Sequence, residues 1–201
     1  MYARDQAAIQ HWACTEGRLV DVVTMVLLSI RMQWVGVGTQ LENVRKFGAK
    51  SPCLWGWKRD GYRYTVANRV SLMRTIDDLR DGEISTRAAM RQFLKVPGLG
   101  LAKAGFCLQL LAGRAGCIDM HNLERLSLDA KALTIPKRKD IHAQMQVIDD
   151  SIDAYLHLIE ECGGTGTLWD EWCEYLADKV STFDGADDVS RRHYTYLYLT
   201  V

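Results

Sequence analysis

The sequence predicts an all-α protein, and three observations support that prediction. Apolar residues recur at helical spacing along most of the chain, and 48% of its 201 residues are apolar, as expected for a folded core. Only three prolines occur, which leaves room for long uninterrupted helices. Residues that cap helices stand at the expected ends, such as Ser85 before one apolar run and Gly48 after another.

The expected helices follow one another with short connections. The first covers 19–30, and Gly36 and Gly38 mark a break after it. Further helices are expected over 39–47, 66–79, 86–94, 103–112, 121–128, 139–161 and 168–180. The stretch 48–64 is rich in glycine, aromatic and basic residues, so a loop or a hairpin around Asp60 and Gly61 is expected there.

The helix over 139–161 is amphipathic, and its apolar residues are expected to share one face. They are Ile141, Met145, Ile148, Ile152, Tyr155, Leu156 and Ile159. Trp169 and Trp172, three residues apart in the last helix, are expected to pack in the core. The sequence shows no internal repeat, and the series of expected helices indicates one all-α unit.

Charge is distributed unevenly along a chain whose formal net charge is zero. Residues 27–76 contain nine Lys or Arg against two acids, a local net charge of +7. Residues 140–188 contain thirteen acids against Lys179 alone, a local net charge of −12. A chain of this kind can present a basic face to phosphates while its acidic part stays in solvent. Blocks of like charge also occur on ordinary helical surfaces, so both interpretations stand.

The cysteines and the apolar runs indicate a cytoplasmic protein. The six cysteines have neither a C-x-x-C pair nor metal-ligand spacing, so reduced thiols are expected. The most apolar run, 19–30, contains Asp21 and is too short to cross a membrane, so no membrane partner is expected. No secretory signal is recognisable at the start of the sequence.

The most informative stretch is 96–126. Its residues Pro97 to Gly100 form the pattern of a tight turn, in which the glycines permit positive φ and a close approach of another chain. The helix that begins directly afterwards presents unpaired N–H groups, which suit a phosphate oxygen. Asp119 follows at the other end of that helix, where it could act on the group that carries the phosphate. The pattern therefore indicates a nucleic-acid site.

These residues resemble the helix-hairpin-helix DNA glycosylase superfamily, whose members carry a hairpin L-P-G-V-G-x-K, a helix, and then V-D-T-H. The hairpin is matched over 96–100, and Ile118, Asp119 and His121 match the aspartate motif. A second stretch, 27–46, resembles the family's early helix pair. Its matching residues are Leu27, Leu28, Trp34, Val37, Leu41, Glu42 and Asn43. The resemblance covers roughly residues 20–130.

The resemblance implies a glycosylase-like fold of two helical lobes with a cleft between them. The chain would form a single glycosylase-like unit over 1–201. Its central lobe would span 27–130 and carry the hairpin at 96–105. The second lobe would combine 1–26 with 131–201 and would carry the acidic stretch 140–188.

Departures from the family's pattern narrow the implied activity. Bifunctional members have a Schiff-base lysine where this chain has Ala102, and Lys103 comes one residue later, rotated by about 100° on a helix. Ile30 replaces the glutamine that many members use to fill the gap left by an extruded base. The four-cysteine run of the iron–sulfur members is absent, so no such cluster is expected. The implied activity is a hydrolase of base excision repair, a DNA N-glycosylase without lyase activity.

The resemblance also assigns roles to residues. Asp119 would be catalytic and would stabilise the positive charge that develops on the sugar, although it could instead cap the helix that follows it. The expected DNA-binding residues are Gly98, Leu99, Gly100, Leu101, Lys103, Gln33, Arg31, Lys58, Arg59 and Arg63. The expected base pocket consists of Trp34, Trp55, Trp57, His121 and Asn122. Core packing remains an alternative for the tryptophans, as does a structural role for His121. A monovalent cation at the hairpin carbonyls is the one cofactor that the resemblance suggests.

Two other functions remain open at this point. The chain could be a non-catalytic DNA-binding or structural protein on a glycosylase scaffold, with a protein partner on the acidic stretch 140–188. It could also be a phage enzyme that hypermodifies bases, since some of these enzymes resemble the same superfamily. The expected location is the cytoplasm or the nucleoid, or the host cytoplasm for a phage protein.

Overall fold

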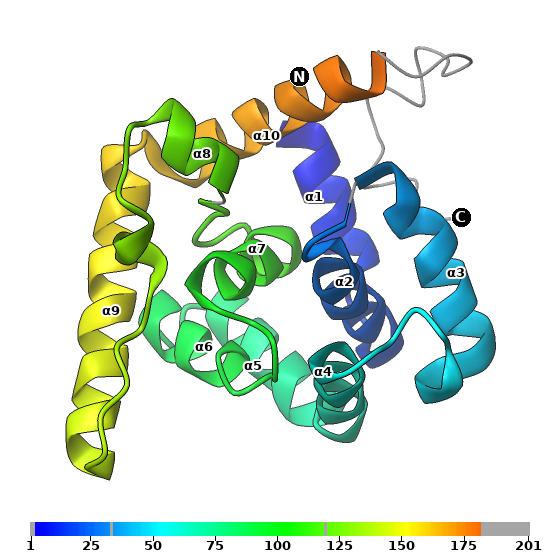
Figure 1. The fold of residues 1–201 in the computed structure, drawn as a ribbon, viewed down its shortest axis with the longest axis horizontal. Helices are drawn as coiled ribbons and strands as arrows, with labels where there is room; N and C mark the ends of the chain where they lie inside the picture. The colour runs from blue at the N-terminus through cyan, green and yellow to red at the C-terminus, as the bar shows by residue number, and fades with distance from the viewer. Residues whose placement is uncertain (1–2, 33, 119, 182–201) are drawn as a thin grey trace.

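The computed structural model describes residues 3–32, 34–118 and 120–181, and within these ranges it contains helices and no β-strand (Figure 1). The α-helices are α1 (Ala3–Trp12), α2 (Glu16–Ser29), α3 (Val37–Phe47), α4 (Trp57–Ala67), α5 (Arg69–Arg80), α6 (Thr86–Phe93), α7 (Leu101–Ala112), α8 (Met120–Arg125), α9 (Ile141–Glu161) and α10 (Gly164–Ser181). Three short 3₁₀ helices are η1 (Trp34–Gly36), η2 (Gly48–Lys50) and η3 (Ala130–Leu133). The predicted all-α class is confirmed for these residues.

Cap residues fix several helix ends close to their predicted positions. The Ser85 hydroxyl accepts a hydrogen bond from the Ala88 N–H at 3.2 Å and begins α6. The Asp140 carboxylate accepts one from the Ala143 N–H at 2.8 Å and begins α9. Gly48 follows α3 with a φ of +54°, which a residue with a side chain rarely adopts. Among the described helices, α1 has no counterpart in the predicted ranges, and nearly all of α4 lies in the stretch 48–64, where a loop or hairpin was predicted.

Two helices form the centre of the molecule, α2 and α7. Every residue from Val22 to Leu28 on α2 is buried, and so is every residue from Ala104 to Leu111 on α7. α2 packs against α3, α4, α5 and α7, and α7 also packs against α1 and α6. Figure 1 shows the other helices arranged around this pair. Sequences this apolar all round suit helices that are covered on most faces.

The prediction for 48–64 is wrong, because α4 begins at Trp57 and contains Asp60 and Gly61. Gly61 is buried, and a Cβ at this position would lie 2.4 Å from the Pro97 carbonyl oxygen. Glycine therefore serves here for the close approach of two chain segments and not for a turn. The predicted helix over 66–79 is likewise divided, since α4 ends at Ala67 and α5 begins after Asn68.

The outer edge is formed by α9, which packs against α6, α10 and η3 (Figure 1). Of the apolar residues predicted on one face of α9, Ile152, Tyr155 and Ile159 are buried. Ile141 and Met145 are 70% and 52% exposed, so the prediction of a packed apolar face is wrong for the first two turns. Trp169 and Trp172 on α10 are buried, which confirms their packing role.

The buried apolar side chains form one connected cluster that extends from Ile9 on α1 to Trp172 on α10. It includes residues of both predicted lobes. Two lobes with a cleft between them, and the glycosylase-like arrangement of the helices, remain predictions from the resemblance.

Candidate functional site

The hairpin turn predicted at 96–100 connects α6 to α7. Backbone hydrogen bonds close it, from Val96 N–H to Phe93 O at 3.0 Å and from Leu99 N–H to Val96 O at 3.1 Å. Gly100 is the N-cap of α7, and its carbonyl oxygen accepts from the N–H groups of Lys103 and Ala104. The turn is thus a rigid connection between two packed helices.

Four N–H groups at this turn make no hydrogen bond with any described residue. They belong to Gly98, Gly100, Leu101 and Ala102. The latter two stand in the first turn of α7, where an α-helix supplies no partner for its donors. Such groups, together with the positive end of the helix dipole, provide a favourable position for an anion. Leu99 was also expected to donate, but its N–H is used inside the turn.

The two exposed glycines of the turn differ in the space that a side chain would have. Gly98 has a φ of +91°, and a Cβ there would lie 2.4 Å from a ring carbon of Trp57. Gly100 has a φ of −96°, and a Cβ there would meet nothing within 4 Å. Gly98 is therefore required by packing, whereas Gly100 leaves open space in front of the helix N-terminus.

Helix α4 packs against the turn. Gly61 lies against the Pro97 carbonyl, and the Trp57 ring lies against Gly98. Leu27 of α2 contacts both of these glycines. Trp55 is 49% exposed and packs edge-on against Trp57, with ring centroids 5.8 Å apart. The structure thus brings together three segments that are far apart in sequence: the end of α2, the start of α4 and the turn.

Lys58 does not occupy the surface position predicted for a DNA contact. Its side chain is 1% exposed, and its ammonium donates to the Leu28 carbonyl oxygen at 3.0 Å. The rings of Trp55 and Trp57 lie 5.6 Å and 5.7 Å from the same nitrogen. The ammonium therefore stabilises the negative end of α2. Burial lowers the pKa of Lys58, since the charged form loses hydration.

Four other predicted cations lie around this region. Arg31 is exposed directly after α2, with a φ of +58°. Arg63 is exposed on α4, one turn beyond the half-buried Arg59, whose Nε has no hydrogen-bond partner among the described residues. Lys103 on α7 is half-buried, with its ammonium 5.7 Å from the Phe106 ring. Arg31 and Arg63 are thus the cations here that solvent reaches most fully.

An aromatic cluster lies beside the first half of α7. Trp34 on η1 is half-buried and contacts the rings of Phe106 and Trp172, at centroid distances of 6.2 Å and 5.2 Å. Phe106 and Trp172 are themselves 5.5 Å apart. Trp34, predicted for the base pocket, therefore packs against α7 and α10 in the structure.

The segment after α7 is fixed by hydrogen bonds from α9. The Tyr155 hydroxyl donates to the Gly116 carbonyl at 2.7 Å and accepts from the Ile118 N–H at 3.0 Å. A Cβ at Gly105 would lie 2.3 Å from the same Gly116 carbonyl, so this segment lies directly against α7. The sequence pattern placed Tyr155 on the apolar face of its helix but did not indicate these hydrogen bonds, because its partners are backbone groups almost forty residues away.

Asn122 has a structural role in place of the predicted base contact. It is 4% exposed, and its amide nitrogen donates to the Cys117 carbonyl oxygen at 2.9 Å. The predicted catalytic residue Asp119 and the predicted DNA contact Gln33 lie outside the described residues, as does the side chain of His121. The chain on both sides of position 119 is held in place, by Tyr155 before it and by Asn122 after it.

The acidic part of the chain is partly neutralised within the molecule. Arg91 of α6 donates to the Asp149 carboxylate at 2.8 Å, and Arg87 donates to Asp153 at 2.9 Å. A second contact joins Arg87 to Asp149 at 3.7 Å. Asp149 and Asp153 are therefore less available to the protein partner that was predicted on 140–188.

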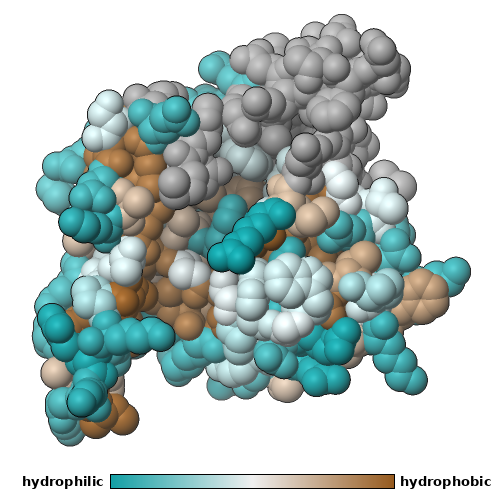
Figure 2. Space-filling model, in the orientation of Figure 1, coloured by the Kyte–Doolittle hydropathy of each residue, from teal (hydrophilic) through white to brown (hydrophobic). Residues whose placement is uncertain are grey.

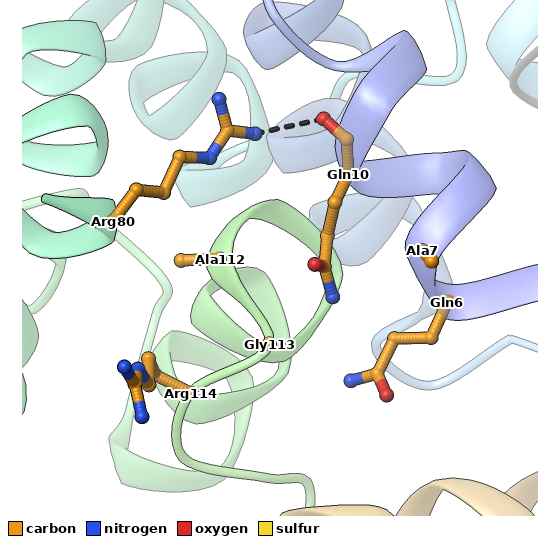
Figure 3. A pocket seen from close by; sticks show the side chains of 7 residues that line it. All are labelled: Gln6, Ala7, Gln10, Arg80, Ala112, Gly113 and Arg114. Carbon is orange, nitrogen blue, oxygen red and sulfur yellow. Dashed lines mark hydrogen bonds between the residues drawn. The ribbon is translucent and has the colours of Figure 1, made fainter. Parts of the chain in front are cut away.

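A polar pocket of about 420 Å³ lies at the opposite end of α7 from the hairpin turn (Figure 3). Its walls include Gln6, Gln10, Arg80 and Arg114. Arg80 donates to the carbonyl oxygens of Gln10, at 2.8 Å, and of Leu111. Its guanidinium thus caps carbonyls at the C-terminal end of α7, where the dipole favours a cation.

The described residues contain no group of three or more His, Cys, Asp or Glu that could hold a metal ion. No helix among them is long and apolar enough to cross a bilayer. All six cysteines are thiols. The chain matches no protein-family model, no curated protein and no solved structure.

Proposed function

We propose that this chain binds duplex DNA through its hairpin face and hydrolyses the N-glycosidic bond of a damaged or modified base. The hairpin face is defined as the turn over 97–100 with Ala102, Trp55, Trp57 and Arg31. The observation that carries the proposal is the group of four N–H donors without partners in the turn and the first turn of α7, where Gly98 and Gly100 are exposed. They match the geometry by which a helix N-terminus binds a phosphate.

The surroundings of the turn support binding to nucleic acid. Trp55 offers an exposed ring beside the donors, and aromatic rings stack on bases in many such sites. Arg31 adds an exposed cation at the end of α2, where electrostatic attraction to the DNA backbone operates. Trp57 and Gly61 hold the turn against α4, so its donors are arranged before DNA arrives.

The chemistry proposed for the site is hydrolysis assisted by Asp119. The base must first leave the helical stack. A carboxylate then stabilises the oxocarbenium-like sugar as the C1′–N bond breaks, and water supplies the oxygen of the new C1′–O bond and the proton for the departing base. Ala102 provides no amine at the hairpin, and Lys103 lies beside Phe106. A Schiff-base step is therefore left out, and the product is an intact abasic strand.

A second candidate is a protein that binds DNA on this scaffold without releasing a base. One finding favours it, since the Asn122 amide is bonded to the backbone and is not available to an extruded base. Both candidates use the hairpin face, and they differ only in the chemistry at Asp119. A protein partner docked on the acidic stretch 140–188 would require neither the hairpin face nor the chemistry at Asp119.

Base release from a panel of duplexes tests the proposal. The panel contains uracil, alkylated bases, oxidised bases and hypermodified pyrimidines, and abasic sites are detected by alkaline cleavage. We expect release from at least one duplex, and we expect Asp119→Asn to abolish it while DNA affinity remains. Asp170→Asn, at an exposed position on α10, is the matched control and should retain activity.

Three results would contradict the enzymatic proposal. They are no abasic site with any duplex, full activity in Asp119→Asn, and equal loss in Asp170→Asn. DNA binding that persists without base release would establish the second candidate instead.

A further inference from the structure

A projecting arm is formed by residues 134–146, which comprise the segment before α9 and its first turns. The Gln144 side chain joins the two parts, because its amide nitrogen donates to the Pro136 carbonyl at 3.3 Å and its oxygen accepts from the Arg138 N–H at 2.6 Å. Asp140 caps the helix at the tip. Figure 1 shows this end of α9 and the chain before it extending beyond the other helices.

The tip of the arm is basic and exposed. Lys137, Arg138 and Lys139 follow one another, all are exposed, and none of their side chains bonds to any described residue. The acid beside them, Asp140, accepts the hydrogen bond that begins α9. His142 and the exposed apolar pair of Ile141 and Met145 complete the surface. Figure 2 shows mostly hydrophilic atoms with a small apolar area at this end of the molecule.

The ion pairs between α6 and α9 show where the tip points. Arg87 of α6 pairs with Asp153 of α9. One turn further along α6, Arg91 pairs with Asp149, which lies one turn back toward the start of α9. The two helices are therefore antiparallel, and α9 extends toward its N-terminus in the direction in which α6 leads into the hairpin turn. With a rise of 1.5 Å per residue, Ile141 lies about 12 Å beyond Asp149 along the helix axis. The tip and the turn are thus at the same end of the molecule.

We infer that the arm is a second contact with the DNA backbone, separate from the hairpin face. The inference rests on the proposed binding of duplex DNA. Unpaired cations on a projecting tip suit a row of phosphates, and the position of the tip allows one duplex to reach both surfaces. The ion pairs of Arg87 and Arg91 with α9 hold the arm in this direction.

Charge reversal on the arm tests the inference, with the full chain and an unmodified duplex as the probe. Arg138→Glu should lower the affinity by about tenfold. It should also make the plot of log affinity against log salt less steep, by about 1 in the magnitude of its slope. Arg114→Glu is the matched control, because Arg114 is also an exposed arginine without a described partner and lies at the opposite end of α7. It should leave both quantities close to those of the unaltered chain.

Different results separate the failure of this inference from the failure of the proposed function. If Arg138→Glu behaves like Arg114→Glu while a hairpin variant such as Gly100→Ala loses affinity, the arm is not a contact and the hairpin proposal stands. If the unaltered chain does not bind DNA at all, both fail. If the chain forms a dimer that Ile141→Ser dissociates without changing DNA affinity, the tip joins two copies and the inference is overturned.

Discussion

At the scale of single residues, Lys58 shows how a fold can use internally a charge that the sequence predicts as a contact for a ligand. In the sequence it stands among tryptophans and arginines, a composition typical of a nucleic-acid surface. In the structure its ammonium donates to a carbonyl oxygen at the C-terminal end of α2 and lies close to two indole rings. The helical spacing of α4 decides between these outcomes, because Lys58, Gly61 and Thr65 share the buried face.

The buried ammonium predicts a pH dependence of stability. Its pKa is lowered from the usual 10.5, so the folded protein releases this proton at a lower pH than the unfolded chain. Between the two pKa values the unfolded chain binds more protons, and the free energy of unfolding therefore rises with pH in that window. Compared with Lys58→Met, the unaltered protein should gain stability in urea unfolding as the pH rises toward the usual lysine pKa of 10.5 from below.

The comparison with Lys58→Met removes the effects of other alkaline titrations, such as that of Tyr62, because both proteins share them. Lys95→Met, at an exposed lysine, serves as the control for the removal of a lysine ammonium. A constant stability difference between the unaltered protein and Lys58→Met across this range would contradict the account.

At the scale of elements, most of the helices were predictable, and the errors have two physical causes. Caps such as Ser85 and Asp140 act on neighbouring residues, so local sequence specifies them. Gly61 was wrongly predicted to form a turn. Glycine is needed at this position because the Pro97 carbonyl of the hairpin lies too close for a side chain. Ile141 and Met145 follow the apolar period of α9 but extend past the helix against which it packs.

The anchoring of the segment before position 119 predicts a clear stability effect. Tyr155→Phe removes the hydroxyl and leaves the Gly116 carbonyl and the Ile118 N–H unpaired in a buried place. The cost should be about 1–3 kcal/mol in the free energy of unfolding. Tyr64→Phe is the control, because the Tyr64 hydroxyl bonds to no described residue, and it should change stability by less than about 0.5 kcal/mol. Equal effects of the two substitutions would show that Tyr155 contributes only its ring.

At the scale of the whole molecule, the sequence indicated the candidate site only in part. The turn, its glycines and the flanking helices could be read from a short motif, because they follow one another in the chain. The support by Trp57, the bonds of Tyr155 and the pairing of α6 with α9 depend on contacts between distant segments, for which a single sequence carries little signal. The same distant contacts place the basic arm at the same end of the molecule as the hairpin.

The central claim is that the start of α7 binds the DNA backbone, and Gly100→Ala tests it most directly. A Cβ at Gly100 meets nothing within 4 Å and the backbone there is extended, so stability should be unchanged or slightly higher. The added methyl group would occupy the open space in front of the free donors. Gly17→Ala is the matched control, since Gly17 also has open space around its Cβ position and stands at the opposite end of α2.

The measurement is the affinity for duplex DNA by fluorescence anisotropy, together with the free energy of unfolding of each variant in urea. The account predicts a loss of affinity of about tenfold or more for Gly100→Ala, equivalent to about 1.4 kcal/mol, and no loss for Gly17→Ala. Equal affinity in the unaltered protein and both variants, with equal stability, would contradict it.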